Sequence, residues 1–317
     1  MALILIAAGA GLLVAGTEAF AEHIVPAART VRVSAFGLAA LVAGAEPEEA
    51  WTASVASWRD RPDLAIGDVL GANLVIATVT LGLLVIVAPV ALTSTVRRYA
   101  VVAGAAAAVA AFVVLGGTVA RPEGLGLIAL YLILVGLLWR VERRPPPIGE
   151  LAEALDDTDE HTDEHTDDDA DDSPGWWPLV WVAAGFVSMI AGGIVVVDGA
   201  ERLVDETGRS DSAIGLTVLA LATSAEMLAL VWSARRRGVP EVALAGTLGA
   251  IAYNATASLG IAAVVRPLDV GDETAALAVS GLVIAAMAAL ATLRSVPRWS
   301  GGVLVAAYVV TVAWLLR

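Results

Sequence analysis

The sequence predicts an all-α polytopic membrane protein with ten transmembrane helices, arranged as two inverted five-helix repeats. Three observations predict this fold: an apolar composition, long uncharged runs and an internal duplication. The 317 residues are 58% hydrophobic, with a mean hydropathy of +0.79, compared with roughly 45–50% apolar residues in soluble domains. Runs such as 101–120, 125–139 and 303–316 carry hardly a charge. Each approaches the length that a ~30 Å hydrocarbon layer requires.

Arginine, proline and glycine interrupt the apolar runs and divide the chain into ten segments. We expect spans near residues 2–22, 33–57, 63–90, 99–119, 124–141, 178–204, 212–234, 240–265, 273–293 and 300–316. The first segment has no basic leader region, so we interpret it as a spanning helix and not as a cleaved signal. The predicted organisation is a first membrane repeat (1–142), a linker (143–177) and a second membrane repeat (178–317).

The linker carries most of the net charge. It holds 13 of the 33 acidic residues, all between positions 150 and 172, and it repeats the tetrad D-E-H-T from Asp159 and from Asp163. Low hydrophobicity and like-charge repulsion predict a disordered, solvated spacer. The alternative is a weak divalent-cation-binding segment that uses these carboxylates with His161 and His165.

The duplication becomes visible when the chain is shifted by 178 residues. The 49 residues that begin at Ser34 then align without a gap with those that begin at Ser212, and 17 positions are identical. The shared residues include Gly37/Gly215, Glu48/Glu226, Arg59/Arg237, Pro62/Pro240, Gly71/Gly249 and Gly82/Gly260. Because each copy has five spans, the second copy must enter the membrane from the opposite side. Inverted repeats of this kind place a binding site near the midplane, where the two halves meet.

Arginine positions predict the orientation, since the chain contains no lysine. Twelve of the 19 basic residues fall on one side of the predicted membrane, and cytoplasmic loops carry the excess of basic residues. We therefore expect a multi-pass protein of the cell membrane, with both termini outside and the linker in the cytoplasm. The chain also contains no cysteine, which excludes disulfides and thiolate metal sites.

Glu48 and Glu226 are the one acidic pair that both copies keep within a span. A carboxylate at the membrane centre costs at least ~2.5–3.5 kcal/mol, so it is normally paired, protonated or functional. Neither predicted span contains an arginine partner in its interior. Two such carboxylates brought together repel each other, so we expect a cation to bind between them.

Calcium suits this pair, because it is a hard cation that takes about 6–8 oxygen ligands and two carboxylates neutralise its charge. The supporting ligands that we expect are Asn73, Asn254, Thr223 and Ser224, with main-chain carbonyls where the spans break. Pro47 predicts one such break, because it lacks an N–H group and clashes with the preceding turn. The alternatives are interhelical hydrogen bonds for the two asparagines and bonds to their own helix for the two hydroxyls.

Two further acids, Glu46 and Glu49, have no acidic counterpart in the second copy, where Ser224 and Met227 stand. Each is a candidate accessory ligand or a water-facing relay for protons or cations. Asp68, which aligns with Gly246, is a similar case.

These motifs resemble the calcium/cation antiporter superfamily, whose best-known branch is the sodium/calcium exchangers. That superfamily carries two inverted copies of GTSxPE, each followed by P-D-L-A-x-G-N-x-x-G-S-N. The first copy here reads G-A-E-P-E-E from Gly44 and P-D-L-A-I-G-D-V-L-G-A-N from Pro62. The second reads A-T-S-A-E-M from Ala222 and P-E-V-A-L-A-G-T-L-G-A-I from Pro240. The resemblance spans nearly the whole membrane body.

The departures from the exchanger motif bear on the ions. Glu48 and Glu226 each lie four residues after the first residue of their motif, Gly44 or Ala222. This is the spacing of the GNxxE motif in the related cation/proton exchangers. The serines of the GSN segment are Ala72 and Ala250 here. These lost hydroxyls weaken the expectation of several sodium sites. Protons can compete with Ca²⁺ for the same oxygens, because burial disfavours the charged form of a carboxyl group.

The resemblance implies a secondary active antiporter that exchanges Ca²⁺ against Na⁺ or H⁺ by alternating access. The alternatives are an exchanger of another cation (Na⁺/H⁺, Mg²⁺ or Mn²⁺), a passive cation channel, and a non-transporting membrane scaffold or sensor that works through the linker. The chain has three histidines, two of them in the linker, and no evident nucleophile with a base, so we expect no enzyme. The expected partners are the lipid bilayer and the transported ions, with no resident cofactor and no nucleic acid.

Overall fold

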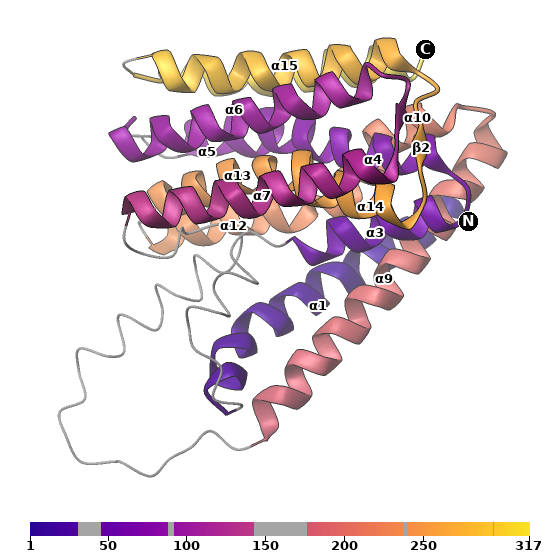
Figure 1. Ribbon diagram of the computed structural model, residues 1–317, viewed down its shortest axis with the longest axis horizontal. Helices are drawn as coiled ribbons and strands as arrows, with labels where there is room; N and C mark the ends of the chain where they lie inside the picture. The colour runs from indigo at the N-terminus through magenta and orange to yellow at the C-terminus, as the bar shows by residue number, and fades with distance from the viewer. Residues whose placement is uncertain (31–45, 88–91, 143–175, 238–239, 294) are drawn as a thin grey trace.

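The computed structural model describes residues 1–30, 46–87, 92–142, 176–237, 240–293 and 295–317, and these are almost entirely helical (Figure 1). The first half contains α1 (Ala2–Thr30), α3 (Pro47–Trp58), α4 (Pro62–Val75), η1 (Ile76–Thr80), α5 (Leu81–Val87), α6 (Ser94–Val114), β1 (Thr118–Val119) and α7 (Arg121–Glu142). The second half contains α9 (Trp177–Thr207), α10 (Asp211–Ile214), η2 (Gly215–Leu219), α11 (Ala220–Thr223), α12 (Ala225–Arg237), α13 (Pro240–Tyr253), η3 (Asn254–Ser258), α14 (Leu259–Val265), β2 (Leu268–Asp269), α15 (Glu273–Thr292) and α16 (Arg298–Leu315). The η segments are single turns of π-helix.

Eight helices in the described part of the chain are long and apolar enough to cross a membrane. They coincide with eight of the ten predicted spans, so the all-α membrane fold is confirmed. The predicted seventh span, 212–234, is broken, because α11 ends at Thr223 and α12 begins at Ala225. In the predicted second span, 33–57, the part before residue 46 lies outside the described residues and the remainder forms α3. Residues 143–175 of the predicted linker also lie outside them.

The secondary structure repeats with the same shift of 178 residues as the sequence. Adding 178 to the bounds of α4, η1 and α5 gives the bounds of α13, η3 and α14 residue for residue. The packing repeats as well, since α7 lies against α14 while the equivalent helices α16 and α5 lie against each other. The predicted duplication is therefore present in the fold.

The second copy is inverted relative to the first. Ser57, at the end of α3, donates hydrogen bonds to the main-chain oxygens of Ala262 (2.8 Å) and Arg266 (3.2 Å). These contacts place the end of α14 beside the turn where α4 begins. The equivalent helix α5 continues from α4 and ends at the other end of the bundle. Figure 1 also places both chain termini at one end of the bundle, as an even number of spans requires.

Proline begins the helices that follow the breaks. Pro47, Pro62 and Pro240 are the first residues of α3, α4 and α13. Proline is favoured there, because the first helical N–H group has no acceptor within the helix and the ring presets the backbone angle. The break predicted at Pro47 is therefore a helix start. Gly44, the other residue expected to loosen this backbone, lies outside the described residues.

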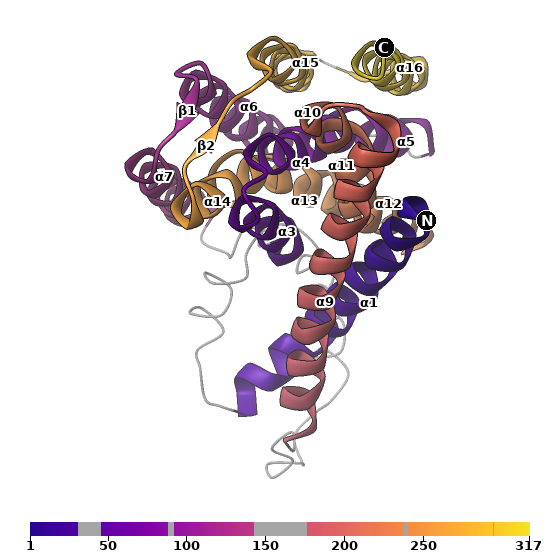
Figure 2. The ribbon, with the colours of Figure 1, turned by 90° about the vertical axis from the view of Figure 1, so that its right-hand side faces the viewer.

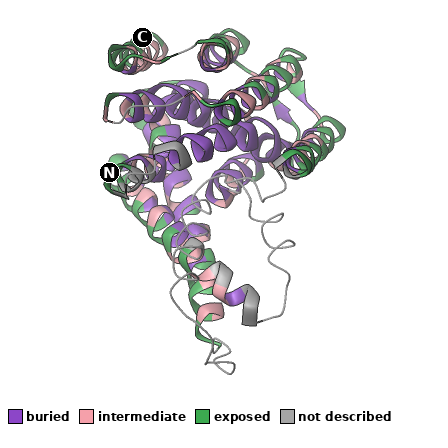
Figure 3. Cartoon of the chain, turned by 90° about the vertical axis from the view of Figure 1, so that its left-hand side faces the viewer, coloured by how far each residue is buried: buried purple, intermediate pink, exposed green. Residues whose placement is uncertain are grey.

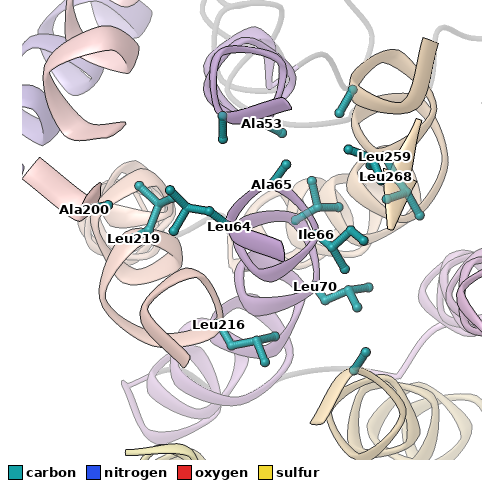
Figure 4. Close-up of a cluster of buried hydrophobic side chains, with 14 of the residues drawn as sticks. Ala53, Leu64, Ala65, Ile66, Leu70, Ala200, Leu216, Leu219, Leu259 and Leu268 are labelled. Atoms are coloured by element: carbon teal, nitrogen blue, oxygen red, sulfur yellow. The ribbon is translucent and has the colours of Figure 1, made fainter. Parts of the chain in front are cut away.

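The two broken helical segments of equivalent sequence occupy the centre of the bundle. In both 62–87 and 243–265, 83% of the most apolar window is buried, compared with 6% for α16 at the periphery. Figure 3 shows this contrast between the buried interior and the exposed outer helices. Around α4, Leu64 and Leu70 pack with Leu216 and Leu219 of the second repeat (Figure 4). Residues of both repeats therefore pack together in the interior.

Glycines allow the central helices to lie close to the outer ones. A Cβ atom on Gly82 would lie 2.8 Å from the main-chain oxygen of Gly301, and one on Gly260 would lie 2.6 Å from that of Gly124. Small residues permit such approach in membrane helices, where packing is the main attractive force between helices. Gly82 and Gly260 are one of the pairs that the duplication preserved.

Helices α1 and α9 form a separate long pair that inclines away from the bundle (Figures 1 and 2). They pack along each other through glycines: a Cβ on Gly16 would lie 2.7 Å from the main-chain oxygen of Gly185. Beyond this pair, β1 and β2 form an antiparallel ladder, with Thr118 opposite Asp269, which joins two loops at one end of the molecule.

Candidate cation-binding site

Glu48 and Glu226 meet in the centre of the protein. Glu48 is the second residue of α3, and Glu226 is the second residue of α12. The residues just before these helices, Glu46 and Ser224, lie outside any helix. The exposed fractions of Glu48 and Glu226 are 0% and 2%, and their carboxyl groups lie within hydrogen-bond contact of each other. Negative charge is favoured at helix N-termini, which offsets part of the cost of burying these acids. The duplication thus brings the two predicted central residues together.

A hydroxyl from α1 also contacts this pair. Thr17 donates to Glu48 Oε2 over 3.3 Å and contacts the main-chain oxygen of Leu13, one turn earlier, over 3.0 Å. The other carboxylate oxygen, Glu48 Oε1, is buried without a hydrogen-bond partner in the described structure. Glu48 therefore offers an oxygen that could still accept a ligand.

The acids without counterparts bind donors from the second repeat. Asn254 Nδ2 donates to Glu46 Oε2 over 2.8 Å, and Ser258 in turn donates to Asn254 Oδ1 over 3.2 Å. Ser224 donates to Glu49 Oε1 over 3.3 Å. Both predicted accessory acids and two of the predicted supporting residues therefore belong to one buried polar cluster.

Local backbone irregularity positions these donors. Asn254 and Ser258 are the first and last residues of η3, and single π-helical turns within α-helices are frequent at functional sites. Thr223 ends α11, and the next residue, Ser224, leaves the helix with φ −80° and ψ 10°. The Ser224 hydroxyl contacts Glu49, and the Thr223 hydroxyl lies 3.2 Å from Asp68 Oδ1 and also within 3.3 Å of the main-chain oxygens of Leu219 and Ala220 in its own helix.

Asn73 differs from the other predicted ligands. It is 3% exposed on α4, and it lines a small cavity with Ser280 where α4, α6 and α15 meet. Its Oδ1 atom has no hydrogen-bond partner among the described residues. Its role as a ligand remains a prediction.

Arginine does not neutralise the buried cluster in the described residues. The arginine ion pairs lie at one end of the bundle, where Arg59 pairs with Asp198 and Glu201 and Arg61 pairs with Asp211. Hydroxyl and amide groups of the second repeat donate hydrogen bonds to Glu46, Glu49 and Asp68. A bound cation would neutralise ionised carboxylates at that depth.

The carboxylates do not converge on one point in this arrangement. Among the described residues no group of three or more His, Cys, Asp or Glu side chains is placed to hold a metal ion. Glu46, Glu49 and Asp68 are each turned toward a different hydrogen-bond donor. Binding a cation through several carboxylates would require these side chains to turn toward one point.

Sequence reasoning missed Thr17 and Ser258 and left Asp68 undecided. Asp68 is fully buried, and its Oδ1 accepts a hydrogen bond from Thr223 over 3.2 Å. The sequence marked Asp68 as a charged residue within an apolar run. Thr17 and Ser258 are hydroxyl residues on apolar helices, and such residues usually bond to their own helix, so no local pattern distinguished these two.

The model of the family described as "Sodium/calcium exchanger protein" matches residues 1–140 and 177–317. The chain is 27% identical over 322 residues to the "Putative antiporter CaxA" of Alkalimonas amylolytica, and the match covers 98% of this chain and 97% of that protein. It is 26% identical over 237 residues to the "Inner membrane protein YrbG" of Escherichia coli K12, covering 74% of this chain and 70% of the other.

Among solved structures, the sodium-calcium exchanger NCX_Mj shares the fold. A comparison with the structure of that protein soaked in Na⁺ and Sr²⁺ gives a TM-score of 0.61 at 22% sequence identity. The match covers 98% of this chain and 95% of that one. With zero Na⁺ and Ca²⁺, the TM-score is 0.62, also at 22% identity, over 99% and 98%. Since the family model covers both membrane repeats, this multi-pass membrane protein belongs to the sodium/calcium exchanger protein family.

Proposed function

We propose that the chain is a secondary active antiporter that exchanges Ca²⁺ against Na⁺ or H⁺ by alternating access. The contact between Glu48 and Glu226, two buried acids at equivalent positions of inverted repeats, carries the proposal. Two carboxylates neutralise one Ca²⁺, which prefers such hard oxygen ligands. The similarity to a putative antiporter and to a sodium-calcium exchanger supports the same transport class.

In this proposal Glu48 and Glu226 are the central ligands of the transported Ca²⁺. The proposed supporting ligands are Asn73, Asn254, Thr223 and Ser224, and the proposed accessory acids are Glu46 and Glu49. Main-chain carbonyls at the end of α11 can add oxygens, because a helix end leaves carbonyl groups without helical partners.

We also propose the cell membrane as the location, with both termini outside and the linker 143–177 in the cytoplasm. The excess of arginines at the predicted cytoplasmic ends of the spans supports this orientation. Cysteines introduced at either terminus of this cysteine-free chain would react with an impermeant thiol reagent in intact cells. Labelling only after permeabilisation would reverse the assignment.

The test of the site uses proteoliposomes and radioactive Ca²⁺. Glu226→Gln keeps the side-chain shape and removes the charge, so we expect uptake driven by an ion gradient to be lost. Glu206→Gln is the matched control, since this glutamate lies at the exposed end of α9 near the N-terminus. Normal uptake by Glu226→Gln would exclude Glu226 as a central ligand.

The counter-ion is tested with the unmodified protein under a Na⁺ gradient and then under a pH gradient alone. Uptake in only one condition identifies the driving ion. Competition by unlabelled Mg²⁺ or Mn²⁺, or Na⁺/H⁺ exchange without Ca²⁺ flux, would identify an exchanger of another cation. Ca²⁺ flux that needs no counter-ion gradient would instead indicate a passive channel.

A further inference from the structure

The turn between α3 and α4 carries three consecutive charged residues, Arg59, Asp60 and Arg61. It lies at the end of the bundle where both chain termini lie (Figure 1). Ser57, just before it, donates hydrogen bonds to main-chain oxygens of the second repeat. The first repeat is therefore in direct contact with the second at this turn.

The two arginines bind separate elements of the second repeat. Arg59 pairs with Asp198 and Glu201 of α9, and its Nη1 atom lies 3.2 Å from Glu201 Oε2. Arg61 Nη1 lies 3.2 Å from both carboxylate oxygens of Asp211, the first residue of α10. Since α9 inclines away from the bundle and α10 leads into the broken span, the turn is joined to both of these parts.

Asp60 has a positive φ of 66°, the one such value at a non-glycine residue in the described part of the chain. Glycine adopts this left-handed conformation without steric cost, and the second copy of the repeat has Gly238 at this position. The aspartate adds a charge that glycine lacks, and its Oδ1 atom lies 2.7 Å from Nη2 of Arg266 at the end of α14. The ion pair gives a reason for an acid at a position where the backbone favours glycine.

The duplication did not preserve this set of charges. In the gap-free alignment, Arg237, Gly238 and Val239 stand where the first copy has its three charged residues. Glycine and valine cannot form ion pairs, so the second copy has no counterparts of the pairs made by Asp60 and Arg61. In transporters built from inverted repeats, movement of one repeat against the other opens the two ends in turn. Ion pairs that only one end can form stabilise the state in which that end is closed.

These ion pairs are partly open to solvent. The side chains of Arg61 and Asp211 are 33% and 20% exposed, and those of Asp60 and Arg266 are 66% and 49% exposed. Dissolved salt weakens such interactions, because mobile ions screen exposed charges over about 8–10 Å. Each pair alone contributes modestly, but pairs that hold the same turn form a network.

We propose that the turn 59–61 and its partners form an ionic lock, which stabilises the closed state of this end of the protein and which salt weakens. The lock rests on the proposed function, because alternating access requires a second state in which this end is open. It makes the balance between the two states depend on the ionic strength on the side that we propose to be outside.

The test measures how often this end opens. Ser57 is 1% exposed beside the turn, so Ser57→Cys places a single thiol there in a chain without cysteine. The rate at which uncharged N-ethylmaleimide modifies this thiol in lipid nanodiscs then reports the open fraction. Arg61→Gln should raise the rate by about two- to fivefold. Arg209→Gln is the matched control, an exposed arginine near the same end that forms no ion pair among the described residues, and it should leave the rate unchanged.

Two further measurements examine charge itself. Asp60→Asn should also raise the rate by about two- to fivefold, since asparagine tolerates a positive φ and only the charge is removed. Choline chloride raised from about 0.01 to about 0.5 M should speed the modification of Ser57→Cys, because it screens the pairs without supplying a metal cation. The combined Asp60→Asn and Arg61→Gln variant should respond less to this salt.

The outcomes also separate opening from unfolding. Ala100→Cys places the thiol at a buried position of α6 toward the opposite end, and Arg61→Gln should not change its rate of modification. An equal rise at both thiols would mean unfolding and would overturn the lock. So would a Ser57→Cys rate that neither substitution changes, or a salt response of the same size in the combined variant.

The lock and the proposed function can fail separately, because the labelling needs no ion flux. If the rates respond as expected but vesicles show no cation exchange, the proposed function fails and the lock stands. Normal exchange by a protein whose labelling does not respond gives the reverse conclusion.

Discussion

Replacing Gly71 by alanine tests how closely α4 must lie against the broken span of the second repeat. A Cβ on Gly71 would lie 2.6 Å from the Cβ of Ala220 and 2.7 Å from the main-chain oxygen of Leu216. Unstrained carbon contacts are about 3.5–4.0 Å. The Leu216 oxygen is a backbone atom of η2, and the Ala220 Cβ is attached directly to the backbone of α11. Neither atom can move aside as the end of a flexible side chain could.

The expected cost follows from two opposing effects. Overpacking costs about 1–3 kcal/mol, and rigid obstacles favour the upper part of that range. Alanine gains about 1 kcal/mol over glycine within a helix. We therefore expect Gly71→Ala to reduce the free energy of unfolding by about 1–2 kcal/mol. Cation exchange should fall as well, because the strain separates Asp68, one turn before Gly71, from Thr223.

The assay is thermal unfolding in detergent, followed by tryptophan fluorescence, with Gly126→Ala as the control. A Cβ on Gly126 meets no atom within 4 Å, so this variant should be at least as stable as the parent. Gly71→Ala should unfold a few degrees lower than Gly126→Ala. Equal midpoints for the two variants would refute the close contact between α4 and α11.

Two further predictions concern the edges of the site. Thr17→Val should weaken Ca²⁺ binding by a few-fold, because it removes the hydroxyl that contacts Glu48. Thr247→Val is the control and should have no effect, because the Thr247 hydroxyl donates to Ala243 of its own helix. Equal affinities of the two variants in radioactive Ca²⁺ binding would contradict this. Arg59→Gln should lower stability by about 0.5–1 kcal/mol through loss of its ion pair with Asp198, and the difference should shrink at high salt. Melting midpoints at two salt concentrations check it, and a difference that salt leaves unchanged would contradict it.

The repeat was the part of the fold that the sequence predicted best. The shift of 178 residues was found from identities such as Pro62/Pro240, and the same shift relates the helix bounds residue for residue. An apolar run of sufficient length has few alternatives to a helix in a membrane, since every backbone polar group must be satisfied within the segment. Helix number and order could therefore be read from one sequence.

The contacts across the site could be predicted only in part. Symmetry selected Glu48 and Glu226, which do meet, because equivalent residues of inverted repeats approach the same axis. Asn73 and Asn254 were both predicted as supporting ligands, yet among the described residues Asn254 donates to an acid of the cluster, whereas Asn73 lines a small cavity with Ser280. Asn254 begins a π-helical turn, whereas Asn73 lies in α4 before the equivalent turn, and residue spacing alone does not reveal such turns.

The asymmetry between the repeats has a consequence for how ions and conformation are linked. Three acids without acidic counterparts, Glu46, Glu49 and Asp68, all come from the first repeat. Each accepts a hydrogen bond from a neutral donor of the second repeat, namely Asn254, Ser224 and Thr223 respectively.

A hydrogen bond to a charged group contributes about 1.5–3 kcal/mol, so three of them hold the two halves together appreciably when the acids are ionised. A cation that takes these carboxylate oxygens competes with the donors for the same lone pairs, and it therefore weakens the contact between the halves. Conversely, a movement of one repeat against the other withdraws the donors and leaves the oxygens free for a cation. We expect ion occupancy and the relative position of the repeats to be coupled for this reason, since each is stabilised at the expense of the other.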